Sequence, residues 1–98
     1  MAKLTTVYWR DIPAQVIAKE RRDTAKAVLS ERFAEAIDKA AMRADMAGTD
    51  AYLEQWRRVV VNCGPDLQAS VDQAAAALEA EFDDTRLEAL IKTGGVAD

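Results

Sequence analysis

The feature that most constrains the fold is an N-terminal run, residues 3–9, whose side chains are nearly all β-branched or aromatic. This composition predicts a β-strand. Pro13 fixes its own φ and forces Ile12 to be extended, so residues 11–13 are interpreted as a turn. Residues 14–19 are then expected to form a second short strand that pairs back as a hairpin. The chain therefore begins with antiparallel β structure.

Helical and strand-like patterns alternate after this hairpin. Residues 19–26 are expected to form a charged connection, with at most one irregular turn. Ser30 is a good N-cap for a helix that ends near Gly48. Further elements are expected at residues 50–56, 57–63, 65–81 and 85–92, the second of these a strand and the others helices, with Pro65 in the first turn of the third.

Three consecutive valines, at positions 59–61, suggest a strand that is buried on both faces and central in its sheet. The order β-β-α-α-β-α-α predicts the α+β class, with a small three-stranded antiparallel sheet and helices packed on one face. The other face would need cover by solvent-tolerant residues or by a partner. Residues 1–92 are expected to form one domain and residues 93–98, which contain two adjacent glycines, a flexible C-terminal tail.

The length of 98 residues leaves room for a single core. Cys63 is the only cysteine, and a lone thiol favours a bacterial-type cytoplasmic location over secretion. Charge is unevenly distributed along the chain. Residues 1–43 hold nine basic and six acidic side chains, a net of +3, whereas residues 44–98 hold four basic and eleven acidic ones, a net of −7.

Catalytic, cofactor-binding and metal-binding patterns are not found, so the sequence predicts that the protein is not an enzyme. It has no histidine, which removes the usual general base and the commonest metal ligand. Its glycines form no phosphate-binding loop. Cys63 could act as a nucleophile only if a neighbour lowered its pKa, and a structural thiol is the favoured interpretation.

Aromatic and basic residues are adjacent at two places, a pairing that is enriched in protein interfaces. The candidate partner-binding residues are Tyr8, Trp9, Arg10, Asp11, Trp56, Arg57 and Arg58. For Trp9 a position in the core is favoured, and Arg10 and Asp11 could serve either the fold or the function. Weak binding of single-stranded RNA is an alternative, because aromatics flanked by arginines can stack bases. The acidic pI near 4.8 makes nucleic acid the less favoured partner.

Several short motifs resemble a small bacterial family known as virulence factor domains. They are Trp9-Arg10-Asp11-Ile12-Pro13-Ala14-Gln15-Val16, Arg32-Phe33, Ala36-Ile37-Asp38, Ala41-Met42-Arg43 and Tyr52-Leu53-Glu54-Gln55-Trp56, within residues 6–58. The resemblance implies a domain without an assigned catalytic role that stands alone or is joined to helical-repeat or iron–sulfur-scaffold-like segments. It also implies an alternative function as an accessory subunit of a corrinoid or one-carbon methyltransferase system. The leading interpretation is a protein-interaction module or a homo-oligomer.

Overall fold

The computed structural model describes residues 2–46, 48 and 50–97, and it confirms the α+β class. Within these residues the sheet has four antiparallel strands, so the expectation of three was wrong. The strands are β1 (Lys3–Trp9), β2 (Ile12–Glu20), β3 (Asp23–Val28) and β4 (Trp56–Asn62). The helices are α1 (Glu31–Arg43), α2 (Asp50–Glu54), α3 (Leu67–Glu81) and α4 (Asp84–Lys92).

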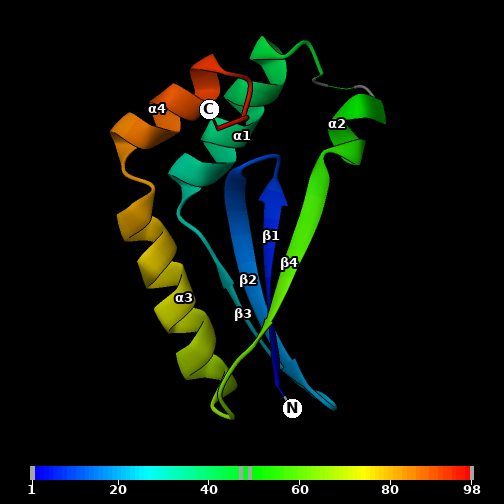
Figure 1. Ribbon diagram of the computed structural model, residues 1–98, viewed down its shortest axis with the longest axis vertical. Helices are drawn as coiled ribbons and strands as arrows, with labels where there is room; N and C mark the ends of the chain where they lie inside the picture. The colour runs from blue at the N-terminus through cyan, green and yellow to red at the C-terminus, as the bar shows by residue number, and fades with distance from the viewer. Residues whose placement is uncertain (1, 47, 49, 98) are drawn as a thin grey trace.

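The strands lie in the order β3-β2-β1-β4, which places β1 between β2 and β4 (Figure 1). The turn between β1 and β2 is formed by Arg10 and Asp11, with Arg10 in the left-handed region at a φ of 55°. Residues 11–13 are therefore not the turn, since β2 already begins at Ile12. Pro13 is tolerated inside β2 because the register of the β1–β2 pair shifts beside it, as a β-bulge allows.

The expected charged connection at residues 19–26 is instead the end of β2, a tight turn and most of β3. Ala25 and Ala27 are half-buried, whereas the alternate residues Thr24, Lys26 and Val28 are exposed. This alternation is that of a strand with one covered face. The sequence analysis missed β3 because its inward residues are alanines, which are depleted in strands and give a weak apolar signal.

The strand of three valines, β4, is an edge strand and not a central one. The exposed fractions of Val59, Val60 and Val61 are 39%, 56% and 51%. A run of β-branched residues favours strand geometry on both faces, but it does not decide whether those faces are covered. Strand β1 is an inner strand, because it pairs with β2 on one side and with β4 on the other.

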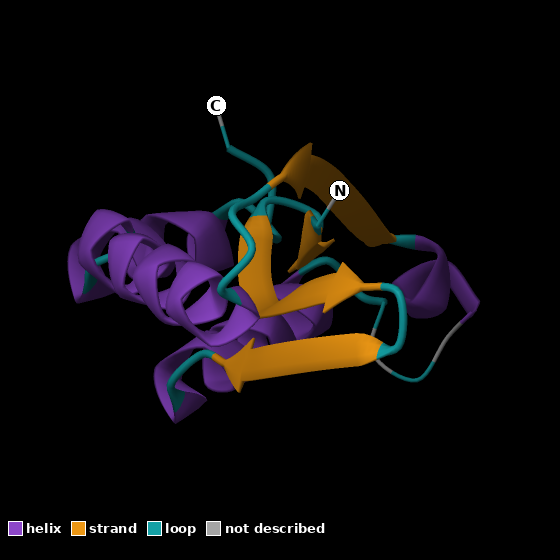
Figure 2. Ribbon diagram, turned by 90° about the horizontal axis from the view of Figure 1, so that it is seen from below, coloured by secondary structure: helices purple, strands orange, loops and turns teal. Residues whose placement is uncertain are grey.

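The helices cover the sheet unequally. Helix α3 packs against β2 and β3, and α1 packs against β2 and α4. Figure 2 shows most of the helical structure on one side of the twisted sheet, with one short helix on the other side. The largest fully buried side chains of the core are Trp9, Phe33, Ile12, Val16 and Val71. The opposite face of β1 and β4 has no comparable layer of helices among the described residues.

Two helix ends differ from expectation. Helix α1 ends at Arg43, before Gly48, and Asp45 takes the left-handed conformation at a φ of 59°. Helix α2 ends at Glu54 because Trp56 already pairs with Trp9 in β4. Ser30 occupies the N-cap position of α1 as expected, but its hydroxyl donates to Glu79 and does not cap the helix.

Candidate functional site

Trp9, at the end of β1, belongs to the core. Its ring is fully buried, and its Nε1–H donates to the carbonyl oxygen of Tyr52 at 2.9 Å. The two rings also stack, with centroids 5.6 Å apart. Trp9 thus holds α2 against the β1–β2 hairpin, as its favoured core position in the sequence analysis anticipated.

Arg10 ties the same hairpin to segments far away in the sequence. Its Nε–H donates to Oε1 of Gln55 at 3.3 Å, and Nη1–H donates to the carbonyl oxygen of Gly94 at 3.0 Å. Nη2–H lies 3.1 Å from the sulfur of Met46. These three contacts hold the guanidinium in place behind the hairpin, so Arg10 serves the fold.

Asp11 and Arg57 form a second set of contacts at this end of the sheet. The backbone N–H of Asp11 donates to the carbonyl oxygen of Gly95 at 2.9 Å, and its Oδ2 accepts from the backbone N–H of Ala97 at 2.6 Å. Residues 93–98, expected to be a flexible tail, include these contacts with the hairpin. Oδ1 of Asp11 forms an ion pair with Nη2 of Arg57 at 3.1 Å.

Tyr8 lies directly opposite Arg57 in the β1–β4 pair. The guanidinium carbon of Arg57 is 4.5 Å from the centroid of the Tyr8 ring, a distance typical of a cation–π contact. The Nε–H of Arg57 donates to the carbonyl oxygen of Arg10 at 2.8 Å. The Arg57 side chain thus contacts the ring of Tyr8 and the carbonyl oxygen of Arg10, although it is exposed to solvent.

Trp56 and Arg58 lie beside these contacts on β4, and Arg58 is exposed, as Arg57 is. Trp56 is half-buried and meets the ring of Tyr52 edge-on at 6.1 Å. It lines two hollows of about 280 and 290 Å³, which adjoin because both also include Gln15. Arg58 lines the second hollow and forms no ion pair with any residue that the structure describes.

The outer edge of β4 carries backbone groups that point away from β1. The β1–β4 ladder is bracketed by two hydrogen bonds, from Cys63 N–H to the Ala2 oxygen and from Arg10 N–H to the Gln55 oxygen, each 3.1 Å long. Hydrogen-bonded pairs alternate in an antiparallel ladder, so every second residue of β4 faces outward. The outward residues are Trp56, Arg58, Val60 and Asn62. Across residues 2–46, 48 and 50–97, no backbone hydrogen bond to another element uses these groups.

Tyr52 forms the wall between the core and the first hollow. Its pKa is raised, first because burial removes water from the phenol and second because the negative charge of Asp38 lies nearby. The phenol therefore stays protonated at neutral pH and acts as a neutral surface. In the described part of the chain, no three Cys, Asp or Glu side chains gather closely enough to hold a metal ion.

The sequence model of the family described as "Virulence factor" matches residues 7–91. The chain belongs to the virulence factor family. The match extends well beyond residues 6–58, on which the sequence resemblance was based, and it includes all seven candidate residues. Comparison with curated proteins and with solved structures finds no match. None of the helices in the described residues of this virulence factor domain is long and apolar enough to span a bilayer.

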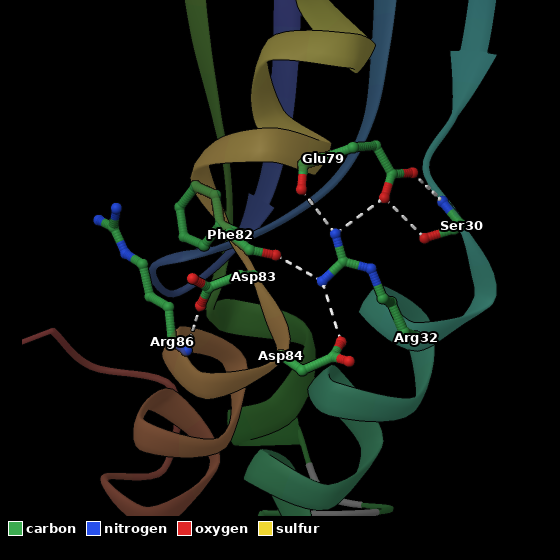
Figure 3. Close-up of polar contacts among 7 residues, drawn as sticks. All are labelled: Ser30, Arg32, Glu79, Phe82, Asp83, Asp84 and Arg86. Atoms are coloured by element: carbon green, nitrogen blue, oxygen red, sulfur yellow. Dashed lines mark hydrogen bonds and ion pairs between the residues drawn. The ribbon is translucent and has the colours of Figure 1, made fainter.

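A polar junction joins three helices of the virulence factor domain (Figure 3). Glu79 accepts from the backbone N–H of Ser30 at 2.7 Å and from its hydroxyl at 2.8 Å, and it pairs with Arg32 at 3.0 Å. Burial alone would raise the pKa of Glu79. The hydrogen bonds from Ser30 and the charge of Arg32 outweigh that effect, so the pKa lies below its usual range. Arg32 also pairs through Nη1 with Oδ1 of Asp84 at 3.4 Å, so these contacts connect α1 to α3 and α4 and indicate a structural role.

Two features of the surface were not foreseen from the sequence. One is the open edge of β4, because the run of valines had predicted a central strand. The other is the placement of Arg57 and Asp11, whose ion pair joins residues 46 positions apart. The adjacency of Trp56 to two arginines was the one sequence signal that pointed to this strand.

Proposed function

We propose that this virulence factor domain is a non-enzymatic, cytoplasmic protein-interaction module that takes an extended segment of a partner protein as a fifth strand beside β4. The observation that carries the proposal is the outward row of backbone groups along an exposed, valine-rich edge. Backbone hydrogen bonds supply affinity in such strand addition, and pockets for alternate side chains supply specificity.

The two edges of the sheet differ in a way that supports β4 as the contact strand. Strand β3 is short, carries Asp23 and Lys26, and is packed against α3. Such charges and cover protect an edge from pairing. Strand β4 has valines at positions 59–61, and in the described residues no helix lies along its outer edge. Three of the seven residues of β4 are exposed valines. Exposed apolar residues on an edge strand without a partner are a liability, so a partner strand is the physical reason to keep them.

The hollow beside Trp56 gives the added strand a place for one apolar side chain. It is lined by Val7, Gln15, Trp56, Arg57 and Arg58, and so it lies next to the first residues of β4. A large aromatic side chain such as Trp56 combines buried area with rigidity, which makes it a typical interface anchor. The accessory-subunit role that the family resemblance implies would require a contact surface of this kind.

The test uses Val60, whose N–H faces outward. In Val60→Pro this donor is removed while the ladder to β1 is kept, and Val60→Thr serves as a matched control that retains the donor. Peptides selected from a displayed random library are titrated into both variants and the unmodified protein. We expect Val60→Pro to weaken binding about tenfold, because the bound peptide loses its hydrogen bond to the N–H of residue 60 and its backbone meets the proline ring.

Hydrogen exchange locates the peptide. Strand addition would slow exchange of the outward amides of Arg58, Val60 and Asn62 and leave the already paired amides of Val59 and Val61 unchanged. Selected peptides that bind without protecting the outward amides, or a library that yields no peptide, would contradict the proposal.

A further inference from the structure

The face of the sheet away from α3 can be assigned residue by residue. Val16 and Ala18 of β2 are fully buried and belong to the same core cluster as Val71 of α3. Since alternate residues of a strand point to opposite faces, Ile17 and Lys19 point to the other side. The strand registers extend this assignment across the sheet. The open face comprises Val28, Gln15, Val7 and Arg58 in one row, Lys26, Ile17, Thr5 and Val60 in the next, and Thr24, Lys19, Lys3 and Asn62 in the third.

This open face is basic in an acidic protein. It carries Lys3, Lys19, Lys26 and Arg58, all exposed, and none of its other positions is acidic. The chain as a whole has 17 acidic and 13 basic residues. Within the described residues, none of the four basic side chains forms an ion pair. The positive charge of this face is therefore available to a partner.

Two of these lysines are placed where they repel each other. Lys3 of β1 lies directly opposite Lys19 of β2 in the register of the sheet. Like charges directly opposite each other destabilise an antiparallel pair. Lys3 donates to Oδ1 of Asn62 at 2.7 Å, a neutral contact that leaves the repulsion in place. An acidic group bound between the two ammonium groups would turn this unfavourable contact into a favourable one.

Apolar side chains separate the lysines from Arg58. Val7 is buried, Ile17 is half-buried and Val60 is exposed, and all three lie in the two rows nearest Arg58. Three rows of a sheet span about 13 Å along the strands, and four strands span about 14 Å across them. A helix is about 10–12 Å wide with its side chains, so one helix lying on this face would contact both charges and apolar centre.

We propose that the open face binds an acidic amphipathic helix of a partner protein, with its apolar stripe on Ile17 and Val60 and its carboxylates on the surrounding basic side chains. Arg58, Val60 and Asn62 belong both to this face and to the outer edge of β4. The helix would contact their side chains and an added strand their backbone groups, so the proposal does not depend on strand addition. Single-stranded nucleic acid fits less well, because bases bind such sheets by stacking and Trp56, the aromatic residue beside this face, is half-buried with its ring edge-on to Tyr52.

The test measures binding of three fluorescent probes by anisotropy. The first is a synthetic amphipathic helical peptide with glutamates on both sides of a leucine stripe. The second has glutamine at the glutamate positions, and the third is oligouridylate RNA. We expect the glutamate peptide to bind most tightly, and its affinity to fall as salt is raised. The Lys19→Glu/Lys26→Glu double variant should lose about tenfold or more of that affinity.

A matched control separates the open face from net charge. Lys39→Glu/Lys92→Glu changes the net charge of the protein by the same amount, but at exposed positions on α1 and α4. It should bind the glutamate peptide within about threefold of the unmodified protein. Lys19→Glu alone should keep or raise the melting temperature, because it replaces the repulsion with Lys3 by attraction. That result would show that a glutamate at position 19 does not weaken binding by unfolding the protein.

Three results would overturn the proposal. The first is equal or absent binding of the glutamate and glutamine peptides. The second is an equal loss of affinity in the two charge-reversal double variants. The third is tighter binding of the RNA than of the glutamate peptide, which would assign the open face to nucleic acid. Strand addition at β4 would stand or fall separately, since its test uses the amides of β4.

Discussion

Gly95 offers a direct test of whether residues 93–97 belong to the folded core. It has a φ of 95°, and its N–H donates to the carbonyl oxygen of Leu90 at 2.7 Å. A Cβ added there would lie 2.8 Å from Cζ3 and 3.2 Å from Cε3 of the Trp9 ring. The Trp9 ring is fully buried, so it has no free space into which to move.

The destabilisation of Gly95→Ala follows from two terms. An L-residue in a left-handed conformation costs about 1–2 kcal/mol. Forcing a methyl group into a packed site costs about 1–3 kcal/mol more. The free energy of unfolding should therefore fall by about 2–5 kcal/mol, which lowers the melting temperature of a domain of this size by roughly 10–30 °C.

The assay is thermal and urea unfolding followed by tryptophan fluorescence, with two other glycines as controls. Gly64 has no heavy atom within 4 Å of an added Cβ, so Gly64→Ala should change the free energy of unfolding by less than about 1 kcal/mol. Gly94 has a φ of 72° and a closest contact of 3.2 Å to the side chain of Ala44. The decrease in the free energy of unfolding caused by Gly94→Ala should therefore lie between those caused by Gly64→Ala and Gly95→Ala. If Gly95→Ala were as stable as Gly64→Ala, the packing against Trp9 would be refuted and the flexible tail expected from the sequence would be restored.

Other contacts give shorter tests. Trp9→Phe removes the closer of the two donors to the carbonyl oxygen of Tyr52 and leaves the N–H of Gln55, so the urea midpoint should fall by the equivalent of about 0.5–1.5 kcal/mol while the slope is unchanged. Glu79 has a lowered pKa, so its stabilisation is present above the unfolded pKa near 4.3 and is lost as pH falls through the folded value. Glu79→Gln should therefore be less stable than the unmodified protein at pH 7 and should approach it in acid; a constant difference across pH would refute this linkage. Ser30→Ala should raise the pKa of Glu79, measured by NMR titration, because it removes the hydroxyl donor to Glu79 and leaves only the backbone N–H of residue 30.

Elements marked by strong local patterns could be predicted from the sequence. The strand at residues 3–9 was found with the correct bounds, and the long helix was found with its correct end at Glu81 but with its start near Pro65, two residues early, because β-branched clustering and helical spacing are local signals. The second strand was also found, although its start was placed two residues late because Pro13 was taken as a turn marker. Strand β3 was missed for a different reason: its covered face is built from alanines.

Positions that depend on distant pairing could not be predicted. The sequence of residues 57–63 does not show whether their strand pairs on one side or on both. That depends on the order of the strands, in which β1 lies between β2 and β4 and leaves β4 at the edge. The same limit applies to the candidate site. Arg10 contacts Gly94, 84 positions away, and only the folded chain shows that this contact makes Arg10 a structural residue. Trp9 was placed correctly in the core because a large aromatic ring in a strand is usually buried.

The energetics of β4 explain why folding and binding can be separated in this domain. Its three valines keep between 39% and 56% of their surface exposed, so they contribute only part of their apolar area to folding. Covering the rest would add about 2–4 kcal/mol, taking about 1.5–3 kcal/mol for each fully buried side chain. Substitutions on the outer row of β4 should therefore change binding far more than the melting temperature. Substitutions at Trp9 or Gly95 should do the reverse, because those residues lie inside the core.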